Sequence, residues 1–414
     1  MSLKWRKKAV LLKMETEYGV DPVPTGLANA IQALDVELTP LQAEALRRGI
    51  LKPFLGQTPA TLVGVHSRLS FGIEFAGSGT AGTPPAYGPI LRACGMAETA
   101  FTGNATIQTS PPTGIDTPVG TFTYAKGDPF AAHLARTVTL TCTTPGGSGV
   151  AAFTVSAPAV GNLAAVNTAG VVMTDAAPFA LANGATIVPT VGTAFEAGDI
   201  YTIALTPPRV EYDPVSEGEE SASCYVNLDG ILHKMTGVRG NVRAAVSSNA
   251  FPRLNVELIG LFTDPAAVAL PTVDYSGFKD PKPSNRTNTI AFSLHGFAAD
   301  LATLELDLGQ AVRYRGLVNT EKIALDDRAG TGRCVIDAPP IGTKDFFAIA
   351  KDGTQGALSW THGLTSGHCV AIDAPAVQIE APAYNNDSGT AQLTMPLALV
   401  PTDAGDDELK ITVK

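Results

Sequence analysis

Charged residues are scarce in this 414-residue sequence, and long apolar runs are absent. Only 16% of the residues are charged, and no run of eighteen apolar residues occurs, which excludes a membrane-spanning helix. The only apolar patch near the start, Ala9–Leu12, is too short for a secretory signal. We therefore expect a protein with no membrane partner.

Cysteine is also rare, and its spacing follows no pairing pattern. The five cysteines form no Cys-x-x-Cys pair: they are Cys94, Cys142, Cys224, Cys334 and Cys369. An odd and widely spaced set favours reduced thiols over a disulfide framework or a zinc site. The sequence therefore predicts a protein assembled in a cytoplasm.

Motifs that carry catalysis are missing. The sequence has no Gly-x-Ser-x-Gly elbow, no His-Glu-x-x-His, no P-loop and no EF-hand loop. The Gly-rich stretch Gly77–Pro85 lacks the Lys-Ser/Thr of a phosphate loop. The nearest pair of histidines, His362 and His368, lacks a third metal ligand. We expect no catalytic residue, no metal, no cofactor and no enzymatic activity.

Positive charge is sparse and gathers at the N-terminus. The formal net charge is −10, so the surface as a whole should repel a polyanion such as nucleic acid. The only basic run comprises Lys4, Arg6, Lys7 and Lys8. Two interpretations stay open for this run: a solvated arm, or an arm that docks on an acidic neighbouring subunit.

Glycine, proline and alternating apolar residues dominate what is present. The chain holds 41 glycines and 30 prolines, and apolar residues recur at period two, which favours a mainly β fold with short helices. The stretch Ser223–Pro265 predicts an antiparallel hairpin, because apolar and polar residues alternate along Asn241–Ser247 and Leu254–Phe262. Arg68–Ala76 alternates in the same way, and a helix is expected over Ala86–Cys94.

The composition changes between residues 136 and 208. Small residues and Gly/Pro/Asn turns recur there at the spacing of a small β-sandwich, which predicts an inserted module on a surface loop. Residues 1–135 and 209–270 then form one part, and residues 271–414 form a second β domain. The acidic stretch Glu211–Ser221 is interpreted as a solvated linker.

A weak internal repeat relates the two parts. A strand, a Gly/Pro connector and a short helix at Leu69–Cys94 are matched by Arg333–Lys351, and the hairpin Val242–Phe262 is matched by Val377–Leu399. The identity is negligible, so the similarity is one of pattern, and coincidence stays an alternative. Elsewhere, Pro40–Arg48 is interpreted as a short helix or an ordered loop.

Seven carboxylates stand on the polar side of alternating strands. They are Asp35, Glu37, Glu74, Glu257, Glu305, Asp307 and Glu380. As catalytic dyads they have no supporting residues, whereas a solvated sheet face needs none. We therefore expect them on one solvated face of a sheet.

Three blocks of sequence carry a resemblance to a known family. They are VLLKMETEYGVDPVPTGLANAIQALDVEL, LKPFLGQTPATLVGVHSRLSFGIEFAGSGTAGTPPAYGPILRACGMAET and DGILHKMTGVRGNVRAAVSSNAFPRLNVELIGLF. In this order they resemble tail tube (major tail) proteins of long-tailed bacteriophages, in which a Gly-x-x-Gly turn precedes a long pair of strands. The resemblance implies a tail-tube-type β-sandwich or barrel with short flanking helices, duplicated here if both parts are tube folds.

The resemblance also implies a function. It is that of a structural virion protein of the tail, assembled in the host bacterial cytoplasm, whose rings stack into a hollow tube that double-stranded DNA crosses without specific binding. The partners would be itself and the tail terminator, tape-measure and distal tail proteins. The seven acids are then candidate lumen residues and the basic run a candidate inter-ring arm. Rings of six chains and rings of three duplicated chains both stay open.

Two other classes of function are weighed against this one. A β-sandwich adhesin or decoration protein would place its binding function in the insert. A hydrolase of unrecognised type would need motifs that the sequence lacks. The order and completeness of the three blocks favour the tube protein.

Overall fold

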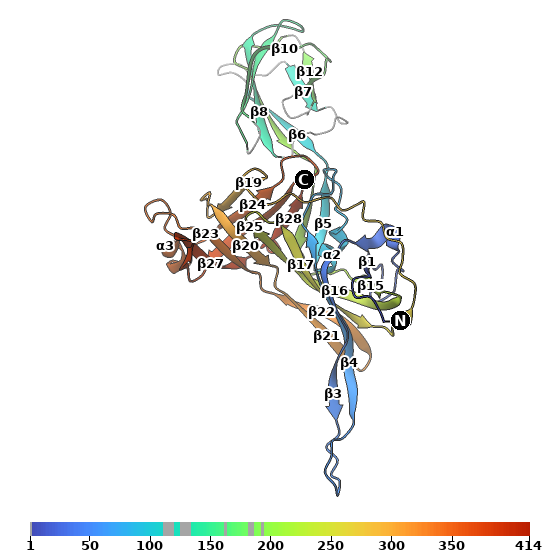
Figure 1. Ribbon diagram of the computed structural model, residues 1–414. Coiled ribbons are helices and arrows are strands. Elements are labelled where there is room, and N and C mark those ends of the chain that lie inside the picture. The colour runs from blue at the N-terminus through green and yellow to red at the C-terminus, as the bar shows by residue number, and fades with distance from the viewer. Residues whose placement is uncertain (1, 111–119, 125–133, 161–163, 181–185, 192–193) are drawn as a thin grey trace.

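The computed structural model describes residues 2–110, 120–124, 134–160, 164–180, 186–191 and 194–414. Strands make up 54% of the chain and helices 4%, which confirms the mainly β fold with short helices. Figure 1 shows a body of antiparallel strands with a small module at one end and a long hairpin at the other. Among the helices of the described residues, none is long and apolar enough to cross a membrane.

Residues up to 262 contribute a first set of paired strands to the body. The ladder runs β1–β15–β16–β17–β4–β3, and every neighbouring pair is antiparallel. Its members are β1 (Lys8–Met14), β3 (Leu34–Arg47), β4 (Ala60–Glu74), β15 (Ala222–Leu228), β16 (Ile231–Ser247) and β17 (Arg253–Phe262). Leu69, Phe71 and Ile73 of β4 are all buried, as the period-two pattern predicts.

The last third of the chain contributes a second set. Its ladder runs β19–β24–β25–β27–β23–β20, again antiparallel throughout, with β26 continuing the course of β25 along β27. Its members are β19 (Thr289–Leu294), β20 (Leu301–Asp307), β23 (Thr331–Asp337), β24 (Gln355–His362), β25 (Val370–Ile379), β26 (Ala383–Asp387) and β27 (Thr390–Val400).

The two sets have the same order along the chain and in the ladder. A short helix follows the third strand of each: α2 (Gly88–Ala93) after β4 and α3 (Phe346–Lys351) after β23. Both helices lie where the sequence predicts them, and Asp345 caps α3 by accepting from the N–H groups of two residues of its first turn. The pattern repeat seen in the sequence therefore corresponds to matching strand pairings.

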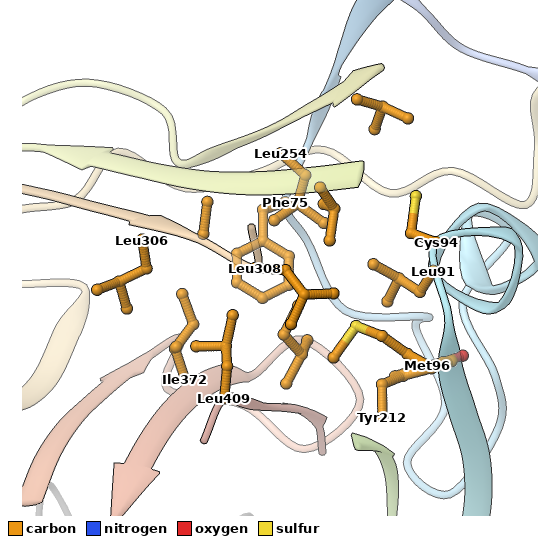
Figure 2. Close-up of a cluster of buried hydrophobic side chains, with 14 of the residues drawn as sticks. Phe75, Leu91, Cys94, Met96, Tyr212, Leu254, Leu306, Leu308, Ile372 and Leu409 are labelled. Carbon is orange, nitrogen blue, oxygen red and sulfur yellow. The ribbon is translucent and has the colours of Figure 1, made fainter. Parts of the chain in front are cut away.

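The two sets share one hydrophobic core. Strand β16 of the first set pairs with β20 of the second, from Arg243–Asp307 to Ser247–Thr303. Figure 2 shows Phe75 and Leu254 of the first set clustered with Leu306, Ile372 and other residues of the second. The predicted boundary near residue 270 therefore separates two chain segments but not two cores.

Two hairpins occupy the same place in the two sets. One is β3–β4, and the other is β21 (Gln310–Leu317) with β22 (Thr320–Arg328), between β20 and β23. The β21–β22 hairpin lies on the first set: the Tyr314 ring stacks on His66 with 5.2 Å between centroids, and the Ile323 N–H donates to Tyr18 Oη at 2.6 Å. Figure 1 shows β3–β4 extending well beyond the body.

One local prediction was wrong. Pro40–Arg48 is not a helix or a loop, because β3 extends through Arg47 and pairs with β4, with register shifts on either side of Gln42. The Gly-x-x-Gly of the third sequence block, Gly237–Gly240, lies inside β16, where a β-bulge opposite β17 absorbs the positive φ of Gly237.

The module consists of two small sheets. The first has the order β10–β9–β8–β13–β6, and the second has the order β11–β12–β7. The members are β6 (Asn104–Ser110), β7 (Gly120–Tyr124), β8 (Arg136–Thr144), β9 (Ala152–Ala157), β10 (Val166–Val172), β11 (Phe179–Ala180), β12 (Thr186–Val191) and β13 (Ile200–Thr206). Phe122 of one sheet packs on Phe153 and Tyr201 of the other, so the module has its own aromatic core. The sequence limits of 136–208 leave out β6 and β7, which pair with β13 and β12.

A stem joins the module to the body. Strand β5 (Met96–Phe101) pairs with β14 (Arg209–Pro214), and β14 also pairs with β28 (Lys410–Val413) at the end of the chain. The stretch Glu211–Ser221 is therefore a strand over its first residues and not a linker, because β14 is paired on both sides and buries Glu211 and Tyr212. The remaining short elements are α1 (Gly26–Asn29), β2 (Ala30–Ile31) and β18 (Ala266–Ala267).

Removing the module should leave the body folded. Phe101 and Arg209 are Cα partners in the stem, so their Cα atoms lie about 5 Å apart and a short Gly/Ser linker can replace residues 104–206. We expect the deletion variant to keep the unfolding transition of the body and to lose only that of the module. Thermal unfolding checks this. Loss of the transition of the body in the deletion variant would show that the body needs the module to fold.

Candidate assembly surfaces

One polar face runs without interruption across both sets of strands. The pairings β3–β4–β17–β16–β20–β23–β27–β26 join eight strands edge to edge. On these strands, six of the seven predicted acids have side chains that point away from the core. Glu380, the seventh, joins them at the end of β25, where its N–H donates to Pro396 O at 2.9 Å. The structure therefore brings all seven acids to one face of one sheet.

Arginines are interspersed among these acids. Arg68 pairs with Glu257, Arg243 pairs with Glu305 at 2.5 Å, and Arg253 lies 3.7 Å from Asp35. These pairs are exposed or half-buried, so each adds less than about 1 kcal/mol to stability. Their main effect is to give the face a mixed charge, less acidic than the list of seven carboxylates suggests.

Four of the acids carry charge without such a partner. Glu37, Glu74, Asp307 and Glu380 form no ion pair with any described residue. Asp307 accepts from Asn241 Nδ2 at 2.7 Å and from the Gly309 N–H at 2.8 Å, so its role is to hold the start of β21 against β16. The net negative charge of the face therefore rests on a small number of unpaired carboxylates.

The tip of the β3–β4 hairpin is strongly apolar and exposed. Leu51 and Leu55 are fully solvent-exposed, at 99% and 102%, and Ile50 and Phe54 are 50% and 66% exposed. The hairpin holds other exposed apolar residues nearer the body: Leu41, Leu46, Leu62 and Val63. Clustered apolar groups of this kind mark protein–protein contacts. Sequence reasoning missed this surface, although the Ile-Leu and Phe-Leu doublets flanking Pro53 were its signal.

The basic run at the N-terminus folds back on its own chain. The Lys4 N–H donates to Asp229 Oδ2 at 2.8 Å, and Lys7 Nζ lies 3.5 Å from Asp229. The hydrogen bond from the Lys4 main chain lowers the pKa of the Asp229 carboxyl. Lys8 begins β1, where its Nζ donates to Val36 O at 2.9 Å and sits over the Trp5 ring. Trp5 itself stays 65% exposed.

The histidine pair considered as a metal site has other contacts. His362 is buried beside Trp360; its Nε2 bonds Lys282 O at 3.0 Å and its Nδ1 lies 3.1 Å from Thr289 Oγ1. Since a carbonyl can only accept, Nε2 carries the proton, and burial lowers the pKa of the ring. His368 lies in an exposed loop. Among the described residues, no group of three His, Cys, Asp or Glu side chains is placed to hold a metal.

The five cysteines are buried and unpaired. Burial raises the pKa of Cys224 and Cys334 to about 12 and that of Cys369 to about 11, and it raises the pKa of Cys94 and Cys142 as well. Thiols with so little thiolate at neutral pH react slowly.

No protein-family model and no curated protein matches this chain.

Proposed function

We propose that this protein is a structural subunit of a phage tail tube, whose copies form rings that stack into a hollow tube for double-stranded DNA. The observation that carries the proposal is the eight-strand sheet with a continuous polar face, whose other side is covered by one core except at the edge strand β26. Both ends of this sheet are strand edges, so further copies can extend it. The order of sequence blocks that resembles tail tube proteins supports the same function.

Contacts between successive rings have candidate surfaces of their own. The β3–β4 hairpin reaches far from the body in Figure 1 and ends in exposed Leu51, Phe54 and Leu55. An apolar tip on a long two-stranded arm suits insertion into a neighbouring subunit, where those side chains leave water. Trp5, next to the basic run, offers a second exposed anchor.

The polar face suits a channel wall. DNA carries about one charge per ~1.7 Å of its axis, so a strongly basic wall would bind it and stop its passage. Three arginine–carboxylate pairs lie on the face, and they leave Glu37, Glu74, Asp307 and Glu380 as unpaired negative charge. Such a surface offers DNA hydration and weak repulsion in place of phosphate contacts.

Charge reversal on this face should make the tube retain DNA. We expect Glu74→Lys/Glu380→Lys to form tubes that bind short double-stranded DNA at low salt, because each lysine neutralises a phosphate and releases a counterion. The measurement is co-sedimentation of DNA with tubes over a series of NaCl concentrations. The control variant Glu17→Lys/Glu217→Lys carries the same charge change at exposed positions off this face. Equal DNA retention by both variants would contradict the lumen assignment.

Concentrated purified protein, imaged by negative-stain electron microscopy, tests the proposal itself. We expect hollow tubes or rings. A strictly monomeric protein at high concentration, in both low and moderate salt, would contradict the proposal. It would favour the alternative of an adhesin or decoration protein that acts through the separately folded module.

A further inference from the structure

The junction between the two sets is built by strand pairing. Residues 302–308 run antiparallel to residues 242–248, with hydrogen bonds from Leu308 N to Val242 O at 3.1 Å and from Ser248 N to Ala302 O at 2.9 Å. The edge of β20 thus completes the first set, and the polar face crosses the junction without a break. The junction supplies a template for how one set joins the next.

The matching ladders show which strands stand in the same places elsewhere. In the first set Phe75 N donates to Pro252 O at 2.9 Å, and in the second Ala338 N donates to Ala391 O at 3.0 Å. These equivalent bonds fix the alignment of β4 with β23 and of β17 with β27. Strand β3 then corresponds to β20, and the continuous course of β25 and β26 corresponds to β16.

The alignment extends to single residues. The alignment of Phe75 with Ala338 places Ser70 at the position of Arg333. Glu37 pairs with Ser70 and Glu305 pairs with Arg333, so Glu37 corresponds to Glu305. Asn385 takes the place of Ala245 in the same way, because Asn385 pairs with Gln392 and Ala245 pairs with Arg253. Within the chain Ala245 and Glu305 are direct partners. Their counterparts Asn385 and Glu37 are not.

Both counterpart strands have a free edge. In the described part of the chain β3 pairs only with β4, and β26 pairs only with β27. All five residues of β26 are exposed, whereas Ala244 and Val246 in the corresponding stretch of β16 are buried. One carbonyl of the β3 edge, Val36 O, accepts from Lys8 Nζ at the bulge that follows Leu34. A free edge at each end of one sheet invites the addition of a strand.

We propose that β26 of one copy pairs with β3 of the next copy, in the antiparallel register of the β16–β20 junction, with Asn385 opposite Glu37. The proposal rests on the proposed function and specifies its ring contact. The interface is head-to-tail, and repetition of such a contact generates a ring when the rotation between copies closes. Each copy supplies two consecutive wall segments, so three copies give the six segments that the resemblance to tail tube proteins implies.

The same correspondence assigns a place to the long hairpin. Within the chain β21–β22 lies on the first set, where Ile323 becomes fully buried and Arg239 donates to its carbonyl at 3.3 Å. In the ring the base of the β3–β4 hairpin lies in the same way on the second set of the neighbouring copy. That contact covers Leu41 and Leu46, which are exposed in the single chain.

An engineered disulfide tests the pairing. In the β16–β20 junction the pairs Val242–Leu308 and Ser248–Ala302 are hydrogen-bonded, and such pairs alternate with non-hydrogen-bonded ones along the strands. Ala245 and Glu305 therefore form a non-hydrogen-bonded pair, with Cα atoms about 4.5 Å apart. That distance suits a disulfide. We expect tubes of Glu37→Cys/Asn385→Cys, after mild oxidation, to yield covalent trimers as the largest species on a denaturing gel. Each single variant should yield none, because the native cysteines are buried.

A matched control shifts one cysteine by one position. Glu37→Cys/Asn386→Cys places the two thiols on opposite faces of the sheet, so it should form tubes without cross-linking. Cross-linking of this control in place of the test variant would overturn the register.

The test variant itself has two contrary outcomes. Tubes that form without disulfides would overturn the pairing while the proposed function stands. Covalent species larger than trimers would overturn closure by three copies. Failure of the unsubstituted protein to form tubes would overturn both.

A second measurement needs no substitution. Asp387 and Thr390 close a two-residue hairpin loop, so the main-chain groups of Tyr384 and Asn386 point away from β27. We expect the exchange of these two amide hydrogens to slow at least tenfold when monomers of the unsubstituted protein assemble. Unchanged exchange in assembled tubes would overturn the pairing, even if the cysteine variants failed to assemble.

Discussion

Replacing residues 48–59 with an Asn-Gly turn should abolish tube formation at concentrations where the complete protein assembles fully. The segment carries Ile50, Leu51, Phe54 and Leu55, and none of these side chains is buried in the single chain. Because the tip buries little apolar surface in the single chain, its removal should shift the melting temperature by no more than about 2 °C. Sedimentation and electron microscopy measure the loss of tubes, and circular dichroism measures the fold.

A gentler change separates the side chains from the length of the arm. Leu51→Ser/Leu55→Ser keeps the hairpin and removes only its two most exposed apolar groups. We expect this variant to require a much higher concentration for assembly. The control Val150→Ser/Val172→Ser makes the same chemical change at exposed positions of the module, and it should assemble normally. Normal tubes from the truncated protein would remove the hairpin from the assembly contacts.

Trp360→Ala should destabilise the whole body by about 3–5 kcal/mol, the range found for truncation of a large buried aromatic residue. Trp360 lies on β24 in the second set and is fully buried. Its ring stacks on Phe75, at the end of β4 in the first set, with 6.1 Å between centroids, and on His362 at 5.3 Å. The cavity left by alanine therefore opens between the two sets and weakens both.

Chemical unfolding distinguishes this shared core from two independent domains. We expect one cooperative transition for the body, shifted as a whole by Trp360→Ala and shifted less by Trp360→Phe, which keeps a ring against Phe75. The module has its own core around Phe153 and Tyr201, so its transition should not move. Separate transitions for the two sets, with only one of them shifted, would contradict a common core.

Much of the fold follows from local alternation in the sequence. The period-two pattern predicts the β16–β17 hairpin and β4, and the short helices α2 and α3 fall inside their expected ranges. The matching order of strand, helix and hairpin in the two parts is also visible in the sequence, because apolar spacing survives where identity does not. These features depend on neighbours in the chain or on a single buried face.

Features that depend on distant partners could not be predicted in this way. Pro40–Arg48 has no strand-like alternation, and it becomes a strand because β4 pairs with it at shifted register. Tyr212 and its neighbours are paired on both sides, by β5 and by β28 at the far end of the chain. The arginines that neutralise the polar face reach their acids only through cross-strand register, as Arg243 reaches Glu305.

The averaged cross-section of tubes formed by the unsubstituted protein, obtained by electron cryomicroscopy, tests the tube function most directly. We predict a hollow tube whose wall repeats six times per ring, built from three chains that each supply two adjacent segments. At every second boundary between segments, β16 should pair with β20 of the same chain. At the other boundaries, β26 of one chain should pair with β3 of the next chain. Six equivalent chains per ring would contradict the two-segment subunit, and the absence of any tube would contradict the proposed function.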